Sequence, residues 1–106
     1  MDSQFKKGVI EVCVLNELKN EKSYGYKLVQ NLSQVFNIGE STIYSMLRKL
    51  TNTNYLNLYE SSISDGPTRK YYTLTDEGKE RLEIINKEWN DFIIKVNGLI
   101  GGNQVE

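Results

Sequence analysis

The stretch R-K-Y-Y-T-L-T, which runs from Arg69 to Thr75, combines two adjacent cations with residues that favour β-strands. It follows S-D-G-P at residues 64–67, whose residue types are typical of a turn. Before that turn, Y-L-N-L-Y-E-S-S-I at residues 55–63 alternates apolar residues with others. The two segments therefore predict a β-hairpin with an exposed, turn-rich tip.

Side chains alternate between the two faces of a strand, so Arg69 and Tyr71 should share one face and Lys70 and Tyr72 the other. One tyrosine is expected to pack on neighbouring helices, and the other is expected to hydrogen-bond outward through its hydroxyl. The pattern does not say which tyrosine takes which role. The hairpin therefore carries a concentrated positive charge at the base of its returning strand.

After the hairpin, the sequence predicts a long helix. Thr75 suits its N-cap, and Asp76 and Glu77 suit its first turn, where the helix dipole favours acidic residues. Apolar residues then recur at spacings of three and four: Leu82, Ile85, Trp89, Phe92, Val96 and Leu99. This seam indicates a dimerisation helix over residues 75–100, and residues 101–106 are expected to be a frayed tail.

Three helices are predicted before the hairpin. The first, around Phe5, Val9 and Cys13, is apolar nearly all the way round, so it packs either against a second copy of the chain or in the centre of one core. Ser23 is predicted to cap the second helix. The third is predicted to start with Asn37 and Glu40 as a capping pair, and Asn54 is expected to take the left-handed conformation after its end. The third helix buries Ile43, Met46, Leu47 and Leu50.

Composition limits the possible functions. The chain has 106 residues, a length suited to one domain, with 39% hydrophobic and 25% charged residues. It has no histidine and one cysteine, which lowers the expectation of catalysis, of a metal site or of a cofactor. The apolar stretch after Lys6 and Lys7 is interrupted by polar residues, so no signal peptide is expected and a cytoplasmic protein without a membrane partner is predicted.

Charge is unevenly distributed although the net charge is −1. Residues 41–75 carry 4 basic and 2 acidic residues, whereas residues 76–106 carry 4 basic and 7 acidic residues. The basic middle contains the third helix and the hairpin. This distribution makes the middle of the chain the candidate surface for an anionic partner.

The order of elements, three helices, a hairpin and a long final helix, predicts a mainly α fold with a small β-hairpin: a winged helix-turn-helix domain over residues 1–74 and a dimerisation helix. The third helix would then read DNA through short hydroxyl side chains and cations, and the hairpin would be a wing that reaches the backbone or minor groove. The competing interpretation of the helix is an ordinary solvated face. The predicted DNA-contacting residues are Tyr24, Ser41, Thr42, Tyr44, Ser45, Arg48, Lys49, Arg69 and Lys70.

Four motifs together resemble the PadR family of bacterial transcriptional regulators across nearly the whole chain. They are Y-G-Y-K-L at residues 24–28, S-T-I-Y-S-M-L-R-K-L at 41–50, R-K-Y-Y-T-L-T-D-E-G at 69–78, and the tryptophan of the final helix. The resemblance implies a homodimeric winged-helix DNA binder that usually represses transcription. The sequence departs from the family at Ser45, where many members have proline, and at Asn54, where glycine is usual.

The resemblance also implies an effector site, because small members of the family bind planar compounds between paired final-helix tryptophans. Here that position is Trp89, with Phe92, Ile93, Phe5 and Val9 as possible walls. The alternative is that Trp89 is a packed seam residue without a cavity. For Cys13, simple packing is favoured over oxidant sensing.

The sequence therefore predicts a homodimeric repressor that binds an inverted-repeat operator in double-stranded DNA. It leaves open whether a small aromatic or hydrophobic ligand binds at Trp89 or whether Trp89 is only a packed seam residue. The main competitor is a winged-helix adaptor that binds protein and not DNA. An enzyme ranks third, because the sequence contains no phosphate-cradling loop or paired carboxylates.

Overall fold

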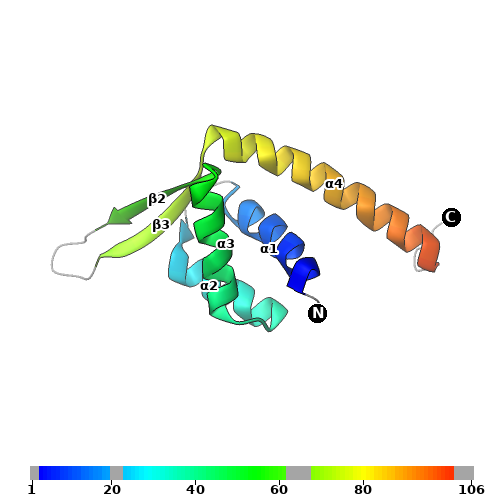
Figure 1. The fold of residues 1–106 in the computed structure, drawn as a ribbon, viewed down its shortest axis with the longest axis horizontal. Coiled ribbons are helices and arrows are strands. Elements are labelled where there is room, and N and C mark those ends of the chain that lie inside the picture. Colours follow the sequence, from blue (N-terminus) through cyan, green and yellow to red (C-terminus); the bar gives the residue numbers. More distant parts are fainter. Residues whose placement is uncertain (1–2, 20–22, 62–67, 102–106) are drawn as a thin grey trace.

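A computed structural model describes residues 3–19, 23–61 and 68–101, with the side chains of the first helix described from residue 7 onward. The predicted hairpin tip at residues 64–67 and all of the predicted tail (101–106) except Gly101 lie outside the described residues. The described residues form seven elements, and Figure 1 shows how the helices and the hairpin are arranged. In chain order they are α1 (Ser3–Glu17), β1 (Ser23–Tyr24), α2 (Gly25–Phe36), α3 (Glu40–Asn52), β2 (Leu56–Ser61), β3 (Arg69–Leu74) and α4 (Asp76–Ile100).

The molecule is elongated, with principal extents of 58 × 29 × 23 Å. In Figure 1 the β2–β3 hairpin projects from one side of the helical body and α4 runs away from the other. This arrangement confirms the predicted mainly α, winged helix-turn-helix fold with a long C-terminal helix.

The hairpin is confirmed, and the sheet has one strand more than the sequence predicted. β3 pairs antiparallel with β2 on one edge and with the two-residue β1 on the other, in the order β1-β3-β2. Tyr24 lies opposite Tyr71, and Tyr71 lies opposite Tyr59. The third strand ties the start of α2 to the base of the wing.

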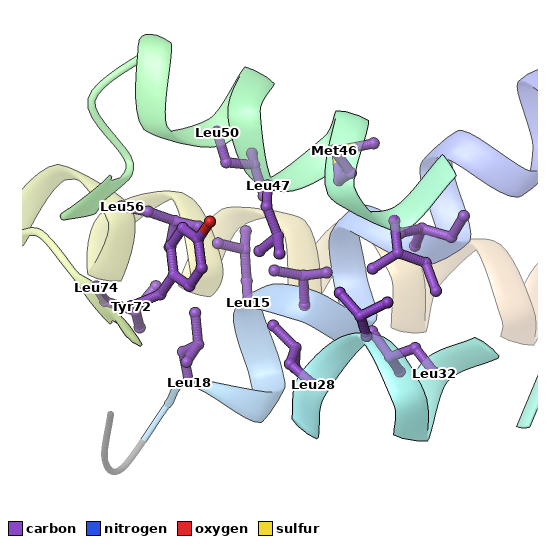
Figure 2. Close-up of a cluster of buried hydrophobic side chains, with 14 of the residues drawn as sticks. Leu15, Leu18, Leu28, Leu32, Met46, Leu47, Leu50, Leu56, Tyr72 and Leu74 are labelled. Carbon is purple, nitrogen blue, oxygen red and sulfur yellow. The ribbon is translucent and has the colours of Figure 1, made fainter. Parts of the chain in front are cut away.

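The core lies where α1 is covered by α2 and α3 on one side and by the first half of α4 on the other (Figures 1 and 2). Ile10, Val14 and Leu15 of α1 and Leu18 just after its end are all buried, and Cys13 packs against the core. Most of the described apolar side chains of the first helix are thus buried or packed against the core within one chain. Figure 2 also shows Tyr72 of β3 among leucines from several elements.

Two predicted helix starts are wrong. α2 begins after Tyr24, and Ser23 lies in β1 because its backbone pairs with β3. The N-cap of α3 is Gly39, which makes no side-chain cap. Asn37 instead ends α2 in the left-handed conformation, with φ of 54°. In each case the residue predicted as a cap makes a different backbone contact: Ser23 pairs with β3, and the N–H of Asn37 bonds to the carbonyl oxygen of Ser33 at the end of α2.

Two other helix ends are confirmed. Asn54 is left-handed, with φ of 68°. Thr75 caps α4, its Oγ1 accepting a hydrogen bond from the backbone N–H of Gly78 at 2.8 Å. The same Oγ1 donates to the carbonyl oxygen of Asn54 at 2.7 Å, so one side chain joins the end of the α3 turn to the start of α4.

Candidate nucleic-acid interface

The exposed face of α3 follows directly from its buried face. Ile43, Met46, Leu47 and Leu50 are all buried and fix the helix against the core. The 3.6-residue period then turns a polar strip outward. The exposed residues of that strip are Ser41, Thr42, Ser45, Arg48 and Lys49.

Arg48 is held in place within this strip. Its guanidinium Nη2 donates a hydrogen bond to the hydroxyl of Ser45, one turn earlier, at 3.1 Å. The departure from proline at position 45 therefore supplies a partner for the arginine. The other donors of the guanidinium stay available for a bidentate contact.

Tyr44 differs from its neighbours because it is half-buried. It lies at the edge of the α3 strip and turns towards the sheet, where it lines a hollow with Tyr72. Tyr72 is only 6% exposed, and burial is the largest cause that raises the pKa of its phenol, followed by Tyr44. Tyr72 is therefore the tyrosine of the pair that packs on the helices.

On the outer face of the sheet, Tyr71 sits in the middle of an aromatic row. Its ring stacks on Tyr59, with centroids 5.3 Å apart, and meets the edge of Tyr24 at 6.0 Å. Tyr24 in turn stacks loosely on Tyr26 at 6.2 Å. Tyr59 and Tyr26 are exposed, so the row is open to solvent at both ends.

The guanidinium of Arg69 lies over the two rings at one end of this row. Its guanidinium carbon lies 5.9 Å from the ring centroid of Tyr24 and 5.8 Å from that of Tyr26. Such cation–π contacts hold a long side chain without using its hydrogen-bond donors. The sequence reasoning included Tyr24 but missed Tyr26, whose place beside Arg69 depends on the unpredicted pairing of β1 with β3.

A hollow of about 270 Å³ lies between the start of α2, α3 and β3. Lys70 joins Arg69 at this hollow, and both cations are exposed. The predicted DNA-contacting residues thus form two neighbouring groups: the α3 strip, and the base of the wing with the start of α2. Tyr44 lies between them.

Comparison with known proteins agrees with this geometry. The sequence profile described as "Transcriptional regulator PadR-like family" matches residues 14–84, which include α2, α3 and the hairpin. This chain belongs to the PadR-like family of transcriptional regulators. It is accordingly a DNA-binding transcriptional regulator, of a family whose members are regulators and not enzymes.

Relatives of this PadR-like regulator cover nearly its whole length. A Streptococcus transcriptional regulator of known crystal structure is 38% identical, with a TM-score of 0.81, covering 92% of this chain and 98% of its own. A PadR-like transcriptional regulator from Bacillus cereus is 34% identical, with a TM-score of 0.79, covering 97% of this chain and 99% of its own. An uncharacterised protein of Lysinibacillus sphaericus is 32% identical over 82% of this chain and 84% of its own.

A second feature of this PadR-like chain is a groove of about 330 Å³ between α1 and α4. Three of the five residues predicted for an effector site, Val9, Trp89 and Phe92, line it together. Ile93 is half-buried and lies outside the lining, and the side chain of Phe5 lies outside the described part of the chain. Glu11 and Arg81 cross the groove as an ion pair at 3.0 Å, a contact that also raises the pKa of the guanidinium.

The predicted seam of α4 divides into two parts. Leu82 and Ile85 are 5% and 6% exposed and pack in the core of the single chain. Farther along, Trp89 and Val96 are half-buried, and Phe92 and Leu99 are 50% and 88% exposed. The apolar residues recur at one regular spacing, but those in the first half of α4 are buried against the body of the molecule and those in the second half are partly or fully exposed.

None of the described helices is both long and apolar enough to cross a membrane. Cys13 is half-buried, and its pKa is raised, mainly by burial and secondarily by Glu17. These surroundings disfavour the thiolate and agree with a packing role for Cys13.

Proposed function

We propose that this PadR-like regulator is a cytoplasmic homodimeric repressor of an inverted-repeat operator. Two copies of α3 lie in successive major grooves, about 34 Å apart, and the wings contact the flanking backbone. The observation that carries the proposal is the α3 strip: its apolar face is fully anchored in the core while its hydroxyl and basic face is open.

Each predicted residue has a role suited to its position. Ser41, Thr42 and Ser45 are short, so the start of α3 can approach the base edges closely. Arg48 contacts a base, because its guanidinium is oriented by Ser45 and can form a bidentate pair with guanine. Lys49, at the far end of the helix, contacts a phosphate.

Dimerisation is carried by the second half of α4. Phe92, Leu99 and Ile100 are exposed apolar residues on a helix that projects beyond the body of the molecule (Figure 1). Ile94 is also exposed, at 67%. A soluble chain rarely leaves such a surface uncovered, and a two-fold copy of the same helix covers it with matching spacing.

Dimerisation is tested by charge substitution on α4. Phe92→Glu and Leu99→Glu should each convert the protein to a monomer in sedimentation velocity experiments at micromolar concentration, because a carboxylate would be buried in an apolar seam. Asn90→Glu, also exposed on α4, is the matched control and should stay dimeric. A wild-type chain that sediments as a monomer alone and on DNA would contradict the dimer.

We also propose that a planar hydrophobic compound relieves repression by binding the α1–α4 groove. The groove brings Val9, Trp89 and Phe92 together at the base of the exposed half of α4, so an occupant would alter how two copies meet. Titration of the protein with planar aromatic compounds should quench or shift the fluorescence of Trp89, its single tryptophan. An unchanged spectrum across a broad panel would count against the effector.

A further inference from the structure

The start of α2 is unlike the start of α4. In α4 the first turn holds two acidic residues, Asp76 and Glu77, and the Thr75 side chain accepts a backbone N–H. The N-cap of α2, Tyr24, makes no side-chain hydrogen bond, and the first turn of α2 has no acidic residue. Among the residues that the structure describes, neither the N-cap nor the first turn of α2 thus supplies an anion to its N–H groups and to the positive end of its dipole.

The hollow at this helix start is lined by groups that bind anions. Arg69 and Lys70 supply two positive charges, and Tyr26, Tyr44 and Tyr72 supply three phenols. Gly25 and Thr68 complete the described lining, which contains no carboxylate. Charges and donors from three separate elements therefore converge on one small volume.

Tyr72 shows that the hollow has an unfilled polar contact. Its side chain is buried, with 6% exposure, and its hydroxyl makes no hydrogen bond to any residue that the structure describes. Yet no described side-chain oxygen is both sealed from solvent and without a partner. The Tyr72 hydroxyl must therefore open to the hollow that its side chain lines, where it can donate to a ligand.

The packing around the hollow keeps it narrow and ordered. Arg69 is held over the rings of Tyr24 and Tyr26, which leaves its N–H groups for a ligand. A Cβ added at Gly25 would lie 3.0 Å from Cε1 of Tyr72, so the glycine lets the first turn of α2 approach the phenol closely. The donors are thus arranged before a ligand arrives.

We propose that this hollow is a seat for one backbone phosphate of the bound DNA, held by the first-turn N–H groups of α2, Arg69, Lys70 and the hydroxyls of Tyr26, Tyr44 and Tyr72. The inference rests on the proposed function, since it presumes a bound duplex. Its consequence is geometric: one phosphate joins α2, α3 and the wing, and so fixes how deeply the α3 strip enters the groove. Tyr26, Tyr72 and the Gly25 amide thereby join the DNA-contacting residues.

The first test uses a duplex that the wild-type protein binds selectively, over a salt series. Lys70→Gln should lower the slope of log affinity against log salt by about 1 per site, because one phosphate contact loses its cation. Tyr72→Phe should weaken binding about five-fold without changing the slope or lowering Tm, because the hydroxyl it removes has no partner in the free protein. Lys87→Gln, an exposed lysine on α4, is the charge-matched control and should change neither.

The second test neutralises phosphates of that duplex one at a time with methylphosphonate. Neutralising one phosphate per half-site should weaken DNA binding by the wild type. The same neutralised phosphate should weaken binding by the Lys70→Gln variant little, because the variant has already lost that contact and the two changes are not additive. Titrating the protein with inorganic phosphate at constant ionic strength shows whether the hollow binds a free anion instead of a DNA phosphate.

The outcomes separate the two proposals. If the wild type binds no duplex selectively, the repressor function fails. If it binds selectively while Lys70→Gln and Tyr72→Phe behave like the control, only the seat is overturned. Saturable binding of inorganic phosphate that Lys70→Gln abolishes, without any change in DNA affinity, would also overturn the assignment to DNA.

Discussion

At Gly78 the fold depends on the absence of a side chain. A Cβ there would meet the backbone carbonyl oxygen of Tyr55 at 2.1 Å, and that same oxygen accepts the N–H of Thr75 at 3.1 Å. The start of α4 thus presses directly on the turn that leads into β2. Because backbone surrounds the site, neither partner can move aside without breaking the Thr75 contact.

Gly78→Ala is therefore expected to lower the free energy of unfolding by about 3 kcal/mol or more, as overpacking against backbone does. Gly98→Ala in the same helix is the control. Its added Cβ meets nothing within 4 Å, so it should be neutral or stabilise by about 0.5–1 kcal/mol. Urea denaturation at one protein concentration measures both, and equal stabilities would refute the close contact.

Cys13 gives a chemical test of burial. Because its pKa is raised by burial and by Glu17, the thiolate fraction at pH 8 is below that of an ordinary thiol. Alkylation by iodoacetamide at pH 8 should be several-fold slower in the native protein than in urea. The rate in the native protein should still be rising with pH above the ordinary thiol pKa. Equal rates in the two states would show an open, reactive cysteine.

The residue scale also shows where sequence reasoning stops. The alternation of side chains correctly predicted that Tyr71 and Tyr72 lie on opposite faces of the strand. Because the two side chains are identical, the sequence does not indicate which of them packs on the helices. That depends on the register of β3 against β2 and β1. The same limit hid Tyr26 and the closeness of Gly78 to Tyr55, which depend on contacts between elements.

At the scale of elements, α3 and the wing should respond differently to the loss of a cation. Arg48→Ala should cost about 1–3 kcal/mol and relax specificity at one base position, because a base contact is lost. Arg69→Ala should weaken binding nearly equally on all sequences, because a phosphate contact is lost. Competition binding with single-base operator variants separates the two patterns, and a uniform loss for Arg48→Ala would remove it from base reading.

Elements with strong periodicity were predictable, and short ones were not. The four helices, the hairpin and the Thr75 cap follow from apolar spacing and capping chemistry. β1 has two residues and no pattern of its own, because pairing with β3 alone makes it a strand. The same pairing places Ser23 in β1 and makes Tyr24 the N-cap of α2. The β1–β3 pairing therefore explains both the unpredicted strand and the wrong cap.

At the scale of the whole molecule, the hairpin and α4 extend in opposite directions from the α1–α3 body (Figure 1). A partner that covers the far half of α4 leaves both wings and both α3 strips free. In the proposed dimer, a two-fold axis relates two DNA-reading surfaces. The spacing of the two half-sites then depends on how the two copies of α4 pack.

Inserting 5 base pairs between the half-sites should therefore abolish high-affinity binding, because half a helical turn moves one half-site to the opposite side of the duplex. The affinity should fall towards that for unrelated DNA in a gel-shift titration. Unchanged affinity for the lengthened site would mean that each copy binds alone.

The most direct test of sequence-specific DNA binding is fluorescence anisotropy with labelled DNA from immediately upstream of the gene, compared with a scrambled duplex over a salt series. We predict tight binding to the upstream DNA, weaker binding to the scrambled duplex, and affinities that fall steeply as salt rises. Equal, weak and salt-insensitive binding to both duplexes would contradict the account and favour an adaptor that binds protein through the same fold.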